Sequence, residues 1–365
     1  MSILDKVKKD KKDAAITQKN IEESREEILA KGKKFRYPFQ YAKHRLVINT
    51  ILICIVALVA FVGLGWLELY RFQSTGDVIY RFTRFIPVSV AKIDGHDVRY
   101  SDYLMLYRSS VTSIEYQQGK FDDSEDSQQL LAQYKRQALN EAENYTYINA
   151  KMKELNITIT DEELDAVIEE HKIVDGEKRD DAVFETVVRD NFGLSLKEYR
   201  HLLELSLARK KVAEAMDSDA KALVEEVKAK LAANGNDFEK MGNEYGMNEL
   251  FNYEKVEGVS IANLDGGRAK VASELEENGA VSDWFVSKNG DGYYIVKLVE
   301  KTDGKVSYES IWIRFSMLAN ELQKIRDDKK IEEYIKIDLK ETPGTEIPDT
   351  DVEATDEPGA EEKDN

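Results

Sequence analysis

The chain has 365 residues, of which 42% are hydrophobic and 33% are charged, and its formal net charge at pH 7 is −18. This size allows one or two domains with hydrophobic cores of their own. The acidic balance argues against nucleic acid as a partner, because a nucleic-acid-binding face is basic. The single cysteine, Cys54, excludes a disulfide within the chain and a cysteine metal site. The histidines have no ligand spacing and no phosphate-binding loop is present, so we expect no metal and no cofactor.

Residues 1–45 form a basic arm with 13 lysines and arginines against 7 acidic residues, a net charge of +6. A thin apolar stripe would allow a short helix from Ala14 to Leu29, but we expect a mostly disordered arm. In either case Pro38 should break the arm before the apolar stretch that follows.

The stretch 46–67 reads LVINTILICIVALVAFVGLGWL and contains no charged residue. A helix of about 20 apolar residues crosses the hydrocarbon core of a bilayer, so the stretch predicts a single transmembrane helix. A buried core helix would not be apolar on every face, and a cleaved signal peptide would be shorter and closer to the N-terminus. By the positive-inside rule the arm lies in the cytoplasm. The rest of the chain is then extracytoplasmic, held at the plasma membrane by one span.

Residues 68–87 are expected to link the span to a mainly helical region at residues 88–216. That region opens with an alternating strand at residues 88–93, followed by an Asp-Gly turn. Thr160 and Ser195 each stand three residues before a glutamate, which predicts a capping box at the start of two helices.

Three segments carry a specific resemblance: VAKIDGHDVRYSDYLMLY, ITITDEELDAVIEEH and FGLSLKEYRHLLELSLARKKVAEAM. They resemble the N-terminal domain of SurA-, PrsA- and PpiD-type folding factors, over residues 88–216. The resemblance implies a helical cradle that holds unfolded, newly exported polypeptides through apolar contacts, near the secretion channel. Five positions are candidates for client binding: Tyr103, Leu106, Tyr107, Tyr199 and Leu203. Plain packing in the core is the simpler interpretation of each position.

The segments AKALVEEVKAKLAANGNDFEKMGNEYG and GAVSDWFVSKNGDGYYIVKLVEK resemble a parvulin-type prolyl isomerase domain, here at residues 219–315. The first parvulin strand is missing before the first helix, but residues 306–315 have its pattern and follow a good hairpin turn. We therefore predict a permuted domain with a small antiparallel sheet, in which residues 306–315 pair with residues 292–300. An ordinary hairpin extension is the alternative.

Parvulins use two histidines and a cysteine or aspartate, and the resemblance places these positions on Ser310, Tyr294 and Asn248. None of the three has the parvulin residue type. Prolyl isomerisation needs an apolar pocket and a polar network that lets the amide lose its double-bond character. The segment expected to line the pocket, residues 265–279, contains neither Met nor Phe. We expect weak or no isomerase activity. The alternatives are an active isomerase with an altered site and a non-catalytic envelope scaffold for one fixed partner.

Residues 316–339 predict a final helix, which the resemblance implies returns to complete the SurA-like domain. Residues 340–365 contain 10 acidic residues and 2 lysines, so they cannot form a hydrophobic core. This composition predicts a disordered tail. The expected fold is mostly α, with a smaller α+β domain. The expected function is that of a membrane-anchored extracytoplasmic chaperone for unfolded polypeptides.

Overall fold

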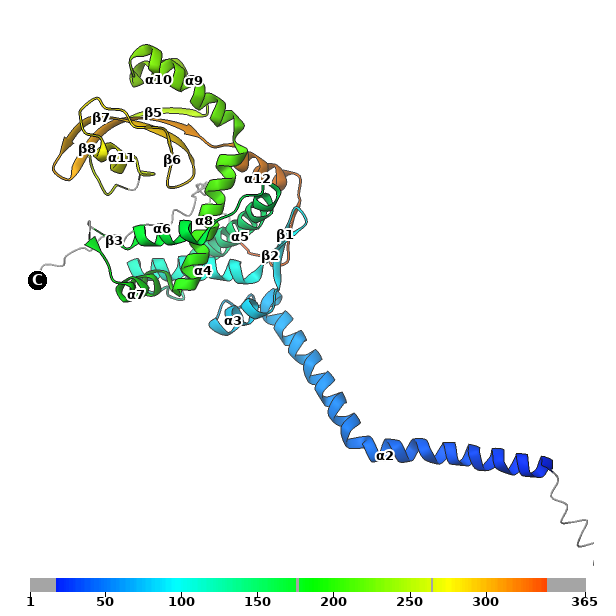
Figure 1. Cartoon of the computed structure of the whole chain (residues 1–365). Coiled ribbons are helices and arrows are strands. Elements are labelled where there is room, and N and C mark those ends of the chain that lie inside the picture. Colours follow the sequence, from blue (N-terminus) through cyan, green and yellow to red (C-terminus); the bar gives the residue numbers. More distant parts are fainter. Residues whose placement is uncertain (1–17, 175–176, 264, 340–365) are drawn as a thin grey trace, which may run out of the picture. The chain divides into compact units, whose positions relative to one another are not determined.

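The computed structural model describes residues 18–174, 177–263 and 265–339, and it divides into two units, Met1–Gln73 and Ser74–Asn365 (Figure 1). The predicted acidic tail lies outside the described residues, as do the first 17 residues of the arm.

The described part of the first unit contains one long helix, α2 (Gln18–Trp66), continued by the short π-helix η1 (Leu67–Arg71). The arm is therefore helical from Gln18 onward, and the predicted break at Pro38 is wrong. An interior proline removes one hydrogen bond and crowds the preceding turn, so it can bend a helix without ending it. Helix α2 is visibly bent in Figure 1.

Within the described residues, His44–Arg71 is the helix that is long and apolar enough to cross a membrane, and it has 28 residues. None of its apolar window is buried inside the chain, so it is not the core helix of a soluble domain. The hydroxyl of Thr50 donates to the carbonyl of Leu46 at 2.8 Å. This polar side chain is satisfied inside its own helix, as hydrocarbon requires.

The second unit begins with a helix that the sequence did not predict, α3 (Asp77–Phe85), inside the expected linker. Tyr80 and Thr83 are buried on one side of α3. The Tyr80 hydroxyl donates to the Glu198 carboxylate at 2.6 Å. The linker region is therefore fixed to the helical domain that follows it.

The helical domain consists of a β-hairpin, a set of packed helices and a second, two-stranded hairpin. The elements are β1 (Ser89–Ile93), β2 (His96–Arg99), α4 (Tyr100–Gln118), α5 (Glu125–Glu154), α6 (Asp161–His171), β3 (Ile173–Val174), β4 (Glu177–Lys178), α7 (Asp181–Phe192) and α8 (Leu196–Met216). Both predicted capping boxes are confirmed. Thr160 and Ser195 accept from the backbone of Glu163 and Glu198, and each glutamate reaches back to the backbone of its cap residue.

The predicted final helix is only partly correct. Helix α12 (Met317–Asp327) ends early, and β9 (Ile331–Glu333) then pairs antiparallel with β1, giving the sheet order β2-β1-β9. Lys329 has φ 54°, a left-handed conformation that no α-helix continues through. The free edge of β1 offers backbone partners, and β9 uses them. The chain does return to complete the helical domain, but as a strand.

Between α8 and α12 lies the α+β domain. Its elements are α9 (Ser218–Asn234), α10 (Phe238–Tyr245), β5 (Phe251–Ser260), α11 (Arg268–Glu274), β6 (Phe285–Val286), β7 (Gly292–Thr302) and β8 (Lys305–Arg314). The sheet order is β5-β8-β7-β6, with every neighbouring pair antiparallel. The predicted pairing of residues 306–315 with residues 292–300 is confirmed through strands β8 and β7. Strand β5 was not predicted.

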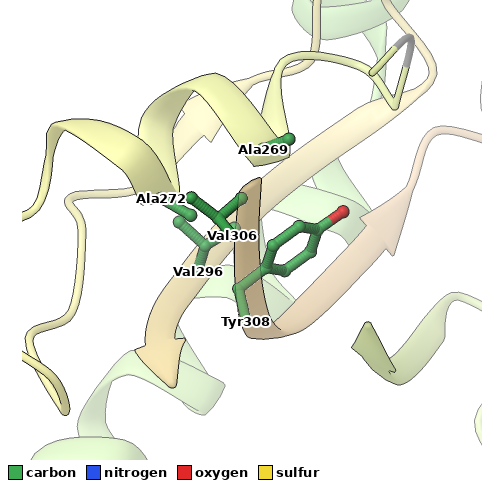
Figure 2. Packing of buried hydrophobic residues seen from close by; sticks show 5 residues of the cluster. All are labelled: Ala269, Ala272, Val296, Val306 and Tyr308. Atoms are coloured by element: carbon green, nitrogen blue, oxygen red, sulfur yellow. The ribbon is translucent and has the colours of Figure 1, made fainter. Parts of the chain in front are cut away.

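Helices cover both faces of this sheet. On one face Ala269 and Ala272 of α11 pack on Val296, Val306 and Tyr308, which are at most 1% exposed (Figure 2). Neighbouring residues on a strand point to opposite faces, so Lys297 lies on the other one. It contacts the residues around α10 there, donating to the carbonyl of Asn236 at 3.3 Å.

One buried carboxylate holds both chain crossings between the two domains. Asp217, which is 0% exposed, separates α8 from α9 and accepts from the Ala220 N–H at 2.9 Å. Its other oxygen accepts from the N–H groups of Ser316 and Met317 at 2.6 and 2.9 Å, where the chain returns from β8 to α12. The entry to the α+β domain and the exit from it are thus tied to the same side chain.

Candidate functional site

Two of the three isomerase-like positions lie close together in the sheet. Ser310 on β8 pairs with Val296, and Tyr294 on β7 pairs with Trp312, so the two positions are diagonal neighbours. Both lie on the face covered by α11, because alternate residues of a strand share a face. Ser310 is 1% exposed and Tyr294 is 3% exposed.

The residue that joins these two positions is Arg268, at the start of α11. Its guanidinium donates to the Ser310 hydroxyl at 3.4 Å and lies 5.1 Å from the centre of the Tyr294 ring. The same nitrogen donates to the Glu254 carboxylate on β5 at 2.6 Å. We did not predict Arg268 as a site residue. The available signal was its place after Gly266-Gly267, in the segment expected to line the pocket.

Several polar groups around Arg268 are hydrogen-bonded within this cluster. The Arg268 Nε donates to the carbonyl of Asp265 at 2.8 Å, and the Asp265 carboxylate accepts from the Tyr308 hydroxyl at 2.5 Å. The Tyr294 hydroxyl donates to the Asp291 carboxylate at 3.0 Å. Burial is the main cause that raises the pKa of both Tyr294 and Tyr308 above the ordinary value. Both hydroxyls therefore stay protonated at neutral pH.

Trp312 closes this face over Tyr294. The two rings stack with centroids 5.7 Å apart and an interplanar angle of 11°. Gly292 gives the indole its room, since a Cβ at that position would lie 2.3 Å from the Trp312 Nε1. The space beside the two expected catalytic positions is filled by side chains of the domain itself.

The third expected position does not join the others. Asn248 is exposed and follows α10 in a turn, where its side-chain oxygen accepts from the Leu250 N–H at 2.9 Å. Its own N–H donates to the carbonyl of Tyr245 at 2.8 Å. Among the described residues, the hydrogen bonds that Asn248 makes do not reach Arg268. Asparagine suits this position because it stabilises turns through its own backbone neighbours.

The five candidate client-binding residues are all buried, at most 7% exposed. Tyr103 contacts Tyr100 edge-on at 5.6 Å and stacks with Tyr107 at 6.4 Å. Tyr199 meets Phe184 edge-on at 5.7 Å. These contacts make Tyr103, Leu106, Tyr107, Tyr199 and Leu203 the core of the helical domain. This burial agrees with the simpler interpretation, core packing, because apolar spacing on a helix identifies the buried face. Client binding by these five residues stays a prediction.

The comparison with protein families covers this helical domain. Residues 39–213 match the family model of the SurA-like N-terminal domain. We therefore call the helical domain, together with α3, the SurA-like domain. The match supports the resemblance to SurA-, PrsA- and PpiD-type folding factors, and it includes the apolar helix. It ends before the α+β domain, so the parvulin resemblance of residues 219–315 stays a prediction. No curated protein matches the chain.

The SurA-like domain does carry exposed apolar side chains. On its elements from α3 to α8, the largest exposed fractions belong to Val78 (79%), Phe85 (89%), Tyr116 (55%), Ile173 (49%) and Val183 (50%). Tyr116 on α4 and Val183 on α7 belong to two helices that pack together. A surface for unfolded chains needs accessible apolar area of this kind.

The SurA-like domain also has an open cleft of about 590 Å³ between the β1–β2 turn and α5. Its lining carries both signs of charge, including Asp97, Arg99 and Lys151. Such a lining does not suit the burial of apolar client segments, because charged groups lose hydration there. The described residues contain no group of three or more His, Cys, Asp or Glu side chains that could hold a metal ion.

Proposed function

We propose that this protein is a membrane-anchored extracytoplasmic chaperone that holds unfolded, newly exported polypeptides beside the membrane. The observation that supports it best is the SurA-like N-terminal domain at residues 39–213, which includes the apolar helix. One helix would anchor the chain, with the basic arm in the cytoplasm and the second unit outside. Proximity to the secretion channel is part of this proposal.

Client contact would use the exposed apolar side chains of the SurA-like domain and not its core. Tyr116, Ile173 and Val183 offer accessible apolar area on α4, β3 and α7. Contacts of this kind are non-directional and scale with the area removed from water, so they suit many unrelated sequences.

The test of chaperone activity uses the full chain in lipid nanodiscs. It should suppress the aggregation of several unrelated chemically unfolded proteins without ATP, as measured by light scattering. A Tyr116→Ser/Val183→Ser variant should need a severalfold higher concentration for the same effect, whereas Tyr116→Phe/Val183→Ile should match the wild type. If no client is protected while a pulldown from membranes yields one stoichiometric partner, the chain is a scaffold and the proposal fails.

The orientation has a separate test in cells, on a Cys54→Ser background that removes the single native cysteine. A membrane-impermeant maleimide should label Met247→Cys, whose parent side chain is 98% exposed, in intact cells. It should label Ser2→Cys only after the membrane is permeabilised. The reverse pattern would place the SurA-like domain in the cytoplasm and remove the proposed function.

We further propose that the α+β domain lacks efficient isomerase activity. Ser310 and Tyr294 are buried, and the Arg268 guanidinium already donates to Glu254 and Ser310. In the described structure, Trp312 stacks on Tyr294 and side chains of the domain fill the space beside these groups, so a prolyl amide would find no open pocket there. The full chain should not accelerate cis/trans exchange of a proline tetrapeptide above the uncatalysed rate. A rate that rises in proportion to protein concentration would instead indicate an active, altered site.

A further inference from the structure

We propose that helix α3 lies on the bilayer surface, with Val78, Arg81 and Phe85 against anionic lipid headgroups. This inference rests on the proposed membrane anchoring of α2. It adds a second, peripheral contact between the extracytoplasmic unit and the same membrane.

Helix α3 has two faces with different environments. Tyr80 and Thr83 are buried, and the Tyr80 hydroxyl donates to Glu198 of α8. Arg84, next to this face, pairs with the same glutamate at 2.8 Å. These contacts fix one face of α3 to the SurA-like domain and leave a defined opposite face.

The opposite face is apolar, basic and exposed. At 100° per residue, Val78, Arg81 and Phe85 fall within one arc, about half a turn away from Tyr80. Val78 is 79% exposed and Phe85 is 89% exposed, and Ile86, just beyond the helix, is 46% exposed. A face of this composition is typical of helices that lie in the plane of a membrane interface.

The chain itself holds this face near a bilayer. Six residue steps separate Arg71, the end of the candidate span, from Asp77, the start of α3. An extended chain covers at most about 3.6 Å per residue, so α3 begins no more than about 22 Å from the end of the span. The aromatic ring of Phe85 suits the headgroup level, where aromatic side chains are enriched.

The charge on this face favours anionic lipids. Arg81 is exposed, and no ion-pair partner for it is found among the described residues. A basic residue near an anionic surface gains attraction that falls off within a Debye length. Arg81 would therefore hold α3 at the headgroups while Val78 and Phe85 enter the interface.

The experiment uses the full chain with Cys54→Ser in proteoliposomes that contain no other protein. A fluorescent label is placed on one new cysteine at a time, and brominated phospholipids report contact with the bilayer by quenching. The label on Phe85→Cys should be quenched at least twofold more than the label on Met247→Cys, an equally exposed position in the α+β domain. The quenching should fall when Arg81→Glu is added or when the anionic lipid is replaced by a neutral one.

Trp66→Cys separates this inference from the proposed anchoring. Strong quenching at position 66 with no excess at position 85 over position 247 overturns the surface contact and leaves the anchor intact. No quenching at position 66 would remove the anchor and both proposals together. Excess quenching at position 85 that is equal in anionic and neutral bilayers overturns the assignment to anionic headgroups.

Discussion

Glu143 is a buried carboxyl whose removal should stabilise the protein at neutral pH. It lies on α5, is 0% exposed, and its Oε1 has no hydrogen-bond partner in the described structure. Its Oε2 is 3.5 Å from a guanidinium nitrogen of Arg326 on α12. Burial, followed by the nearby charge of Glu333, raises the pKa of Glu143 from 4.5 to about 7, against the opposing charges of Arg326 and Arg136.

The sign of the effect follows from proton linkage. Between pH 4.5 and 7 the unfolded chain ionises this carboxyl while the folded chain keeps it protonated, so stability falls as pH rises. Each pKa unit corresponds to about 1.4 kcal/mol, so the full penalty above pH 7 is about 3 kcal/mol. Glu143→Gln removes this penalty, and a gain of about 3 kcal/mol raises the unfolding temperature of a domain of roughly 200 residues by about 6–12 °C.

The assay is thermal unfolding of the full chain in detergent, at several pH values from 5 to 8. Glu143→Gln should be nearly as stable as the wild type at pH 5 and increasingly more stable towards pH 8. Hydrogen exchange should locate the gain at the pairing of β1 with β9, where Ala91 lies opposite Glu333. Glu154→Gln, an exposed position on the same helix, is the control and should show no such pH dependence. A Glu143→Gln gain that is absent at pH 8, or the same at every pH, would refute this account.

Two further changes test how the domains are held. Asp217→Ala leaves three backbone N–H groups without their acceptor and should lower the free energy of unfolding by about 3 kcal/mol, whereas Asp219→Ala should change it little. Gly292→Ala places a methyl group 2.3 Å from the Trp312 Nε1 and should cost about 1–3 kcal/mol, with Gly76→Ala, which has no neighbour within 4 Å, as its control. Thermal unfolding measures both changes. If a variant and its control lower the free energy of unfolding equally, the contact assigned to Asp217 or to Gly292 is contradicted.

The sequence predicted helices correctly where a capping residue stood just before a stretch with apolar residues at helical spacing. The capping boxes at Thr160 and Ser195 are both present, because a cap depends only on residues within one turn. The same reasoning missed α3. Its apolar residues Phe85 and Val78 are exposed, so they do not mark a buried helix face that would distinguish α3 from a linker. It also extended the final helix through Ile331, although the partner that makes this segment a strand is β1, more than 200 residues away in sequence.

The candidate site was only partly predictable for a similar reason. A hairpin fixes its register locally, so the proximity of Ser310 and Tyr294 could be predicted from the turn between their strands. Arg268 comes from another layer of the domain, and only tertiary packing places it over both positions. The client candidates are buried because periodicity reports which face of a helix is apolar, not what covers that face.

The position of β9 has a consequence for how the SurA-like domain forms. Its sheet contains β1 at the beginning of the second unit and β9 close to the end of the described residues, so the domain is discontinuous in sequence. The whole α+β domain must be made before residues 331–333 can cover the free edge of β1. Asp217 then joins the two connections of the inserted domain, because it accepts from Ala220 at the entry and from Ser316 at the exit. An inserted domain held in this way can be retained for its place beside the helical domain, even when two of its isomerase-like positions, Ser310 and Tyr294, are buried and hydrogen-bonded to Arg268 and Asp291.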